Sequence, residues 1–298
     1  PAFTSIVLAL LRGRFVAEKV VALVSAIGLT AFSLWLLGEV DGSESGVMGM
    51  VVGGWEAPYG VALVADRLAC IMLCLSSGVG LVALIYTFWT VTDVQHRHFV
   101  YSLFNVVILG CTWAFVSVDL FNLFVSYEVM LVGSYGMMMV GAGKAQVRQT
   151  MKYIGINAVG STIFVAGIGL IYATTGTLNM ADLAVRTQAL TGAKAQMVTA
   201  CSMVLLTVFA MKTAAWPLYF WLPDSYPVVP AGINGFYAGL LTKVGVYSLL
   251  RMFGMVFRQP GAESALTVLL VLSGFTMLLG VLGAMCQWDI RRILSWHI

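Results

Sequence analysis

The sequence predicts an all-α, polytopic transmembrane helix bundle, and three observations lead to that fold class. Hydrophobic residues make up 60% of the 298 residues and charged residues only 10%, whereas soluble domains carry about a quarter charged residues. Mean hydropathy is +0.94. Apolar segments of about 20 residues, the length that crosses a hydrocarbon core of about 30 Å, recur along the whole chain. We therefore expect one membrane domain over residues 1–298.

Nine helical segments and the start of a tenth account for the chain. The expected spans are residues 1–11, 18–38, 61–91, 98–118, 119–141, 150–173, 197–225, 231–257 and 264–286. The first begins at Pro1 inside an apolar run and is taken as partial, and "WDIRRILSWHI" gives the tenth only its first turns. The seventh contains Pro217, which cannot donate a backbone hydrogen bond and crowds the carbonyl of Thr213. That helix is therefore expected to be broken around 212–217.

Basic residues are concentrated in alternate loops. They are Arg12, Arg14, Lys19, Arg97, Lys144, Arg148, Lys152, Arg291 and Arg292. Because cytoplasmic loops carry the excess of lysine and arginine, these loops are predicted to be cytoplasmic and the N-terminus outside. The opposite loops include residues 38–60 and 174–196, neither long enough for a soluble domain.

Nothing in the composition predicts a cofactor, a metal or a nucleic-acid partner. The five cysteines contain no CxxC motif, which disfavours an iron–sulfur cluster. Histidine pairs are absent from the apolar segments, so haem ligation is not expected. The formal net charge of +3 is too small to predict nucleic-acid binding.

Three ionisable residues fall within apolar segments. Glu128 follows Asp119 by nine residues, which places it about 13 Å along a helix and near the membrane midplane. Lys212 ends the run "MVTACSMVLLTVFAMK", and Lys243 is the twelfth residue of "GINGFYAGLLTKVGVYSLLRMF". Each such charge costs about 2.5–3.5 kcal/mol on insertion scales, so the three together cost roughly 8–10 kcal/mol. A structural role could be filled at lower cost, which favours a role in ion conduction.

The lysine at 212 and the predicted break at Pro217 belong to one feature. An opened helix is tolerated at membrane depth only where protein or water satisfies its freed backbone groups, and broken helices mark ion sites in transporters. We therefore expect a hydrated proton or ion site there. The alternative is that a single lysine extends its charge to the interface or pairs structurally. Trp216 and Trp221 either form an interfacial belt or line this cavity.

Glycines accompany the lysine at 243. Gly235 and Gly239 precede it at eight and four residues, on the same helical face. Two turns without side chains on that face would let a neighbouring helix approach.

Several stretches of the sequence resemble a known family. They are "DLFNLFVSYEVMLVGSYG", "MKYIGINAVGSTIF", "YATTGTLNMADLAVR", "FAMKTAAWPLYFWLPDSY", "GLLTKVGVYSLLR" and "GGWEAPYGVALVADRL". They are similar to the D subunit of Mrp-type multisubunit cation/proton antiporters, within the superfamily of antiporter-like proton-pumping subunits of respiratory complex I and membrane-bound hydrogenases. "TGTLNMADLAVR" and "TKVGVY" are the stretches most specific for the D subunit.

The resemblance implies two inverted five-helix repeats. The first would occupy residues 98–257 after N-terminal helices at 1–97, and only the start of the second, at 258–298, would be present. It further implies that Glu128 pairs with Lys212 and tunes its proton affinity, and that Lys243 relays protons along a hydrated central axis. The second repeat's own broken helix and exit-side charge are missing.

The function implied is that of a proton-translocating subunit of a monovalent cation/proton antiporter, most simply Na⁺/H⁺. It would be a secondary transporter and not an enzyme. It would lie in a prokaryotic plasma membrane with other subunits, protons and a monovalent cation as partners. One alternative is the pump module of a redox-driven complex, an NADH:quinone oxidoreductase or a membrane-bound hydrogenase. Another is a structural membrane scaffold, in which the central charges could be replaced without loss.

Overall fold

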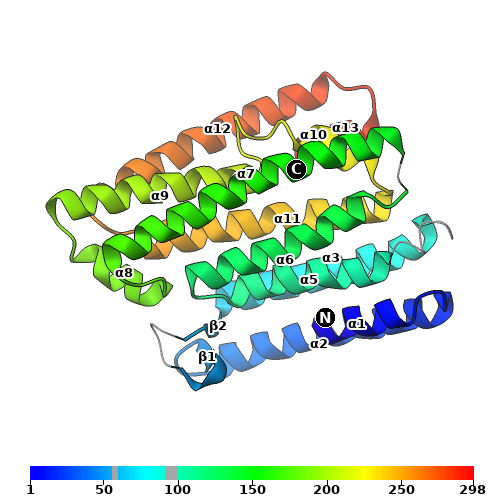
Figure 1. Cartoon of the computed structure of the whole chain (residues 1–298), viewed down its shortest axis with the longest axis horizontal. Helices are drawn as coiled ribbons and strands as arrows, with labels where there is room; N and C mark the ends of the chain where they lie inside the picture. The colour runs from blue at the N-terminus through cyan, green and yellow to red at the C-terminus, as the bar shows by residue number, and fades with distance from the viewer. Residues whose placement is uncertain (56–59, 92–98, 142) are drawn as a thin grey trace.

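Long helices lying side by side form the molecule (Figure 1). The computed structural model describes residues 1–55, 60–91, 99–141 and 143–298. The helices are α1 (Ala2–Leu10), α2 (Phe15–Gly42), α3 (Arg67–Thr90), α5 (Val100–Val116), α6 (Leu120–Met138), α7 (Lys144–Thr175), α8 (Met180–Gln188), α9 (Gly192–Lys212), α10 (Leu222–Ser225), α11 (Ala231–Arg251), α12 (Glu263–Met285) and α13 (Ile290–His297). A π-helical turn, η3 (Met252–Val256), extends α11. A short 3₁₀ turn, η2 (Tyr226–Val228), follows α10.

The predicted fold class is confirmed. In the described part of the chain, six helices are long and apolar enough to cross a membrane: α2, α3, α7, α9, α11 with its π turn, and α12. Helix α5 is apolar but has 17 residues, and α6 has 19. The chain is a multi-span membrane protein.

Two predicted helix starts are wrong. Residues 62–66, expected within a helix, form strand β2 (Ala62–Asp66), which pairs antiparallel with β1 (Val47–Val51). Helix α3 begins only at Arg67, because the Asp66 side chain accepts the Ala69 backbone N–H at 2.9 Å and caps the helix. Helix α7 begins at Lys144, six residues earlier than expected. Arg97 and His98, a predicted loop residue and repeat boundary, lie outside the described residues.

The loop expected at 174–196 contains a helix. Asn179 accepts the backbone N–H groups of Ala181 and Asp182 at 3.1 and 3.2 Å, the geometry of an N-cap, and starts α8. Lys194 belongs to the first turn of α9 and not to a loop.

The bundle has two distinct ends. The hairpin and α8 lie at one, which we call the hairpin end; α10 and α13 lie towards the other, which we call the break end (Figure 1). The described basic residues of the predicted cytoplasmic loops gather at the break end, but only Arg12 and Arg14 lie in a loop: Lys19 belongs to α2, Lys144, Arg148 and Lys152 to α7, and Arg291 and Arg292 to α13. By the distribution of basic residues, that end is the predicted cytoplasmic one.

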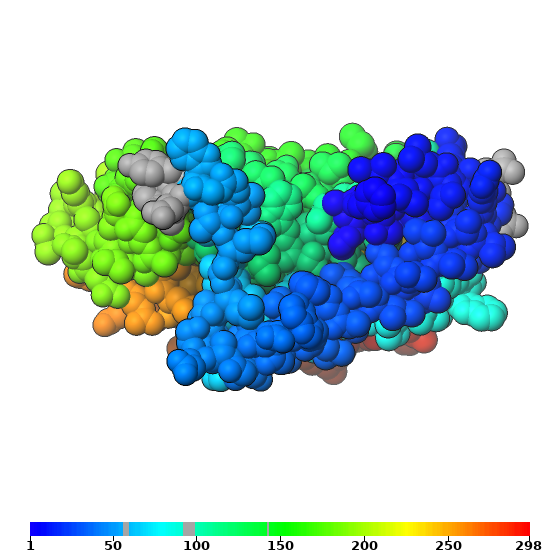
Figure 2. All heavy atoms as spheres, turned by 90° about the horizontal axis from the view of Figure 1, so that it is seen from below, coloured from blue at the N-terminus to red at the C-terminus, as the bar shows by residue number. Residues whose placement is uncertain are grey.

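Helix α11 runs through the middle of the bundle and α12 along one edge (Figure 1). In the most apolar 18-residue window of each helix, 61% of the residues are buried in α11 and 6% in α12. Helices α1 and α2 cover the opposite edge (Figure 2). Apolar side chains point outward from α2, including Val16, Val20, Val24 and Ile27, as expected for a helix that faces lipid. The polar groups described next lie on the central helices.

Candidate functional site

Glu128 lies in the middle of α6 and is half-buried. Its carboxylate accepts a hydrogen bond from the Ser161 hydroxyl on α7. Asp119 caps the start of α6 by accepting the N–H groups of Phe121 and Asn122 at 2.9 and 3.0 Å. That cap fixes the start of the helix and so places Glu128 two and a half turns along it, as the sequence predicted.

Lys212 is the last residue of α9 and is only 5% exposed. Its ammonium donates to the Asn157 side-chain oxygen on α7 at 2.9 Å. Burying an ammonium is costly unless it is hydrogen-bonded and compensated by an opposite charge. The bond is supplied by Asn157, and the Glu128 carboxylate lies close enough to attract the ammonium.

Glu128 and Lys212, both among the described residues, share no direct hydrogen bond or ion pair in this conformation. Helix α7 links them instead, because Asn157 and Ser161 are one turn apart on it. Gly160 allows α9 to come this close. A Cβ at Gly160 would lie 1.8 Å from the terminal carbon of Met211 and 3.8 Å from a side-chain carbon of Lys212.

The break after Lys212 occurs where the sequence predicted it. Its opened backbone is satisfied by protein groups: the Trp221 indole donates to the carbonyl of Met211 at 3.1 Å, and the Trp216 N–H donates to the Thr276 hydroxyl at 2.9 Å. Trp221 is buried, and Trp216 lines a cavity. Both tryptophans therefore belong to the break.

That cavity has a volume of about 60 Å³ and lies against the broken segment, between it, α12 and α13. Polar groups of Thr213, Thr276 and Ser295 are among its lining residues. One water needs about 10–15 Å³ and two or more polar partners, so the cavity has room for several waters. The buried hydroxyls of Ser225 and Tyr226, just beyond the break, have no hydrogen-bond partner within the described ranges.

Lys243 lies at the centre of α11 and is half-buried. Its ammonium turns back towards the break end, donating to the Ala238 carbonyl at 2.9 Å and the Thr242 hydroxyl at 3.2 Å. The predicted close approach holds for one of the two glycines. A Cβ at Gly239 would lie 2.5 Å from Val79 of α3, whereas the space at Gly235 is open.

A glycine missed by sequence reasoning lies where the broken segment meets α11. A Cβ at Gly245 would lie 3.0 Å from the backbone nitrogen of Thr213 and 3.2 Å from the carbonyl carbon of Lys212. The broken segment therefore packs directly on α11, two residues beyond Lys243.

A polar row along α7 was also missed. Its members are Gln146, Thr150, Tyr153, Asn157 and Ser161. Their spacing of three or four residues places them on one face, and the first four are buried. The row runs from the break end to the Glu128 and Lys212 groups and stops there. The spacing is visible in the sequence and could have identified the row.

Toward the hairpin end the same face of α7 is mainly apolar. It carries Phe164, Ile168 and Ile171, each no more than 2% exposed. The buried face of α7 is therefore polar in one half of the membrane and apolar in most of the other.

Sequence reasoning also missed Arg251 at the end of α11. Its guanidinium donates to both carboxylate oxygens of Asp66, at 2.6 and 2.8 Å. Of the four ion pairs found in the described ranges, this one is the most buried. Burial raises the pKa of the Asp66 carboxyl, but hydrogen bonds from Arg251 and the Ala69 backbone outweigh it and hold that pKa below its ordinary value.

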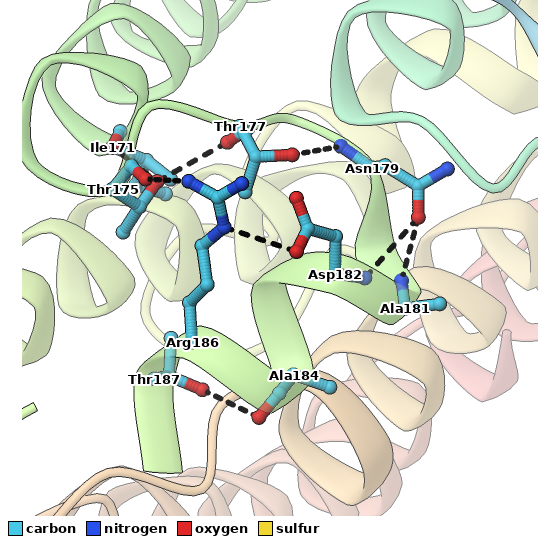
Figure 3. Close-up of polar contacts among 9 residues, drawn as sticks. All are labelled: Ile171, Thr175, Thr177, Asn179, Ala181, Asp182, Ala184, Arg186 and Thr187. Carbon is cyan, nitrogen blue, oxygen red and sulfur yellow. Dashed lines mark hydrogen bonds and ion pairs between the residues drawn. The ribbon is translucent and has the colours of Figure 1, made fainter. Parts of the chain in front are cut away.

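The stretch "TGTLNMADLAVR" forms a hydrogen-bonded network at the hairpin end (Figure 3). Arg186 donates to the Asp182 carboxylate at 3.0 Å and to the Thr175 carbonyl at 2.9 Å, and so ties α8 to the end of α7. The Arg186 hydrogen bond holds the pKa of the Asp182 carboxyl below its usual value. Thr187 donates to the carbonyl of Val256 at 3.1 Å and ties α8 to the π turn after α11. Glu128, Lys212 and Lys243 take no part in this network.

Comparison with known proteins agrees with this geometry. The family model described as "NADH:quinone oxidoreductase/Mrp antiporter, TM" matches residues 117–296, which contain the three charges and the break. The chain belongs to this family. Within it, the resemblance to the Mrp D subunits is confirmed by curated relatives.

Two of those relatives are D subunits of antiporters with different named cations. The D subunit of the Na⁺/H⁺ antiporter of Alkalihalophilus pseudofirmus is 42% identical over 282 residues, covering 94% of this chain and 56% of that protein. The D subunit of a probable K⁺/H⁺ antiporter of Rhizobium meliloti is 38% identical over 250 residues, covering 83% and 46%. The chain thus spans about half the length of the curated relatives it matches.

Solved structures of family members have the same fold. A chain of the Mrp complex from a Dietzia species superposes with a TM-score of 0.88 at 30% identity, covering 99% of this chain and 55% of that one. A chain of the archaeal membrane-bound sulfane sulfur reductase has a TM-score of 0.92 at 24% identity, which shows the shared fold alone.

Proposed function

We propose that this chain carries protons part-way across a membrane as part of a subunit of a monovalent cation/proton antiporter. Glu128, Lys212 and Lys243 form the relay. The observation that carries the proposal is that Glu128 and the buried Lys212 bind residues one turn apart on one face of α7, next to an interrupted helix that packs on α11. Other antiporter subunits, a prokaryotic plasma membrane and a monovalent cation complete the assembly.

The chemistry follows from how burial and a nearby carboxylate act on a lysine. Burial disfavours the ammonium, and a carboxylate near it favours the ammonium. When Glu128 is close, Lys212 holds its proton. When Glu128 is bound to Ser161, the attraction weakens, and the proton passes to Lys243 through the polar region at the break. Opening and closing of the pair thus moves a proton in steps.

The polar row on α7 supports entry from the break end. Hydroxyl and amide groups can line a path for water or protons, whereas the apolar half of α7 towards the hairpin end offers none. Lys144, Arg148 and Lys152 lie at that entry, and by the distribution of basic residues it faces the cytoplasm.

The relatives favour an antiporter over a redox-driven pump. The curated D subunits, at 33–42% identity, are named as antiporter subunits. The likeness to a respiratory complex is at 24% identity and concerns the fold alone.

The test is cation-dependent proton exchange in membrane vesicles containing the assembled complex. Lys212→Ala and Glu128→Ala are each expected to abolish exchange. A dye that reports the internal pH after addition of Na⁺ or K⁺ measures it, and gel analysis of the native complex confirms assembly.

Two exposed residues give matched controls. Lys194→Ala changes a lysine in the first turn of the same helix as Lys212, and Glu263→Ala changes a glutamate in the first turn of α12. Both variants should exchange cations at the wild-type rate. Normal exchange by assembled Lys212→Ala or Glu128→Ala protein would show that the pair is structural.

A further inference from the structure

The polar groups of α11 do not stop at Lys243. Tyr247 and Arg251 follow at four and eight residues, on the same helical face. This row leads from the proposed relay to the hairpin end of the bundle. Such a row could offer a proton a second way out of the membrane.

The hydrogen bonds of Tyr247 close that route. Its hydroxyl donates to the Phe115 carbonyl at 2.6 Å. The same oxygen accepts two guanidinium N–H groups of Arg251, at 2.5 and 3.1 Å. A phenol hydroxyl has one proton to donate and two lone pairs. All are in use, so Tyr247 has no free lone pair with which to accept a proton from Lys243.

Arg251 is itself unable to relay a proton. An arginine stays protonated in proteins, so it cannot pass a proton on. Its side chain is 9% exposed, and that of Asp66 is 19% exposed. The carboxylate is anchored by three donors: two from Arg251 and the backbone N–H of Ala69 at 2.9 Å. The guanidinium is therefore fixed at the hairpin end of the row between the Asp66 carboxylate and the Tyr247 hydroxyl, so the ion pair is neutral overall but turns its positive side towards Tyr247.

A fixed positive charge beside a path through a membrane protein repels protons. Arginine side chains exclude protons and cations from other membrane pores by this means. The repulsion is stronger at the lower dielectric of a protein than in water. The amine of Lys243 is turned away from Arg251, towards Ala238.

We propose that Arg251 is an electrostatic barrier that keeps protons on Lys243 from leaving through the hairpin end of this chain. The inference rests on the proposed relay through Lys243. Arg251 is thereby a residue that makes transport directional, and Asp66 and Tyr247 hold its guanidinium in place. Phe164, Ile168 and Ile171 make the buried face of α7 apolar towards the same end of the bundle.

A purely structural ion pair is the competing explanation. Removing either partner of a buried pair destabilises a protein, since the other charge is left uncompensated. A structural pair therefore predicts similar defects in Arg251→Gln and Asp66→Asn. A barrier predicts a defect only where the positive charge is lost.

The experiment measures passive proton leak after a pH step, in vesicles that contain the assembled complex, with choline salts and a permeant anion on both sides and no Na⁺ or K⁺. Arg251→Gln should raise the leak about tenfold over wild type, because the positive side of the ion pair that faces the path is lost. Arg251→Lys and Asp66→Asn keep the positive charge and should leak no more than wild type.

The double variant Asp66→Asn, Arg251→Gln guards against misfolding, because two amides can still hydrogen-bond without a buried unpaired charge. It should assemble and leak like Arg251→Gln. Wild-type leak in either assembled variant lacking the arginine overturns the proposal. Equal leak in Asp66→Asn and Arg251→Gln also overturns it, in favour of a structural pair.

A further variant separates this proposal from the relay. Adding Lys243→Leu to Arg251→Gln should return the leak to the wild-type level if Lys243 carries the escaping proton. A leak that survives this change rejects Lys243 as the carrier and overturns the proposal that Arg251 retains protons on it.

Discussion

Asn157→Leu should slow transport by about tenfold or more without preventing assembly. Asn157 is 3% exposed, and its oxygen is the acceptor for the Lys212 ammonium at 2.9 Å. A hydrogen bond to a charged group contributes about 1.5–3 kcal/mol. The variant loses this free energy only in the conformation in which Asn157 holds Lys212. The equilibrium therefore shifts towards direct pairing of Lys212 with Glu128 by about 10- to 150-fold. A lysine kept at Glu128 delivers its proton more slowly.

The assay is the initial rate of cation-dependent proton exchange at several pH values, in vesicles with equal amounts of assembled complex. Asn105→Leu is the matched control. Asn105 is a buried asparagine on α5 that bonds to the Tyr101 carbonyl and contacts none of the three central charges. If Asn157→Leu showed the wild-type rate and pH profile, α7 would not set the position of Lys212.

Three other outcomes are expected. Lys243→Ala should reduce exchange less than Lys212→Ala does, because water near the break can partly replace the side chain; equal loss, measured as initial exchange rate, would contradict this. Gly110→Ala should lower the thermal unfolding temperature, since its Cβ would lie 2.5 Å from the backbone nitrogen of Met130, and overpacking of this kind costs about 1–3 kcal/mol; Gly155→Ala, where the space is open, is the control. Because the folded-state pKa of Asp66 is below its ordinary 3.8, its pair with Arg251 should stabilise the protein above that pH and lose this effect as the pH falls further. The difference in unfolding temperature between wild type and Asp66→Asn should therefore shrink on acidification, and a difference that is constant with pH would refute this.

The sequence was sufficient for features that depend on local chemistry. Helix α9 ends at Lys212 because the chain leads into Pro217, whose ring and missing N–H are properties of one residue. The cost of a charge in lipid likewise depends on residue type and depth. Glu128, Lys212 and Lys243 were therefore identified before any coordinates, as residues within membrane helices.

The partners of those charges could not be predicted in the same way. Ser161 and Glu128 are 33 residues apart, Asn157 and Lys212 are 55 apart, and Asp66 and Arg251 are 185 apart. Such contacts depend on how helices pack, and several packings bury the same apolar segments equally well. The family resemblance led us to expect a direct Glu128 to Lys212 pair, whereas in this conformation the two groups bind Ser161 and Asn157 of α7.

The hairpin and α8 were missed for a different reason. Residues 62–66 are apolar enough to continue a helix, and the signal that separates them from α3 is a single cap at Asp66. Residues 47–51 were expected within the loop at 38–60. Helix α8 has nine residues and starts at the Asn179 cap. Elements this short are set by one or two hydrogen bonds, whereas hydropathy averages over about 20 residues and does not detect them.

The change from a polar to an apolar buried face along α7 accounts for the position of Glu128 and Lys212. A polar face along the whole helix would connect both sides of the membrane through a single chain, and a proton would then pass without being coupled to a cation. A face that was apolar throughout would leave Lys212 without Asn157 and without access from either side. In this chain the polar face reaches Ser161 and then gives way to Phe164. Glu128 and Lys212 lie at that boundary, so under the proposed function a proton entering from the break end meets this pair before any further route is open to it.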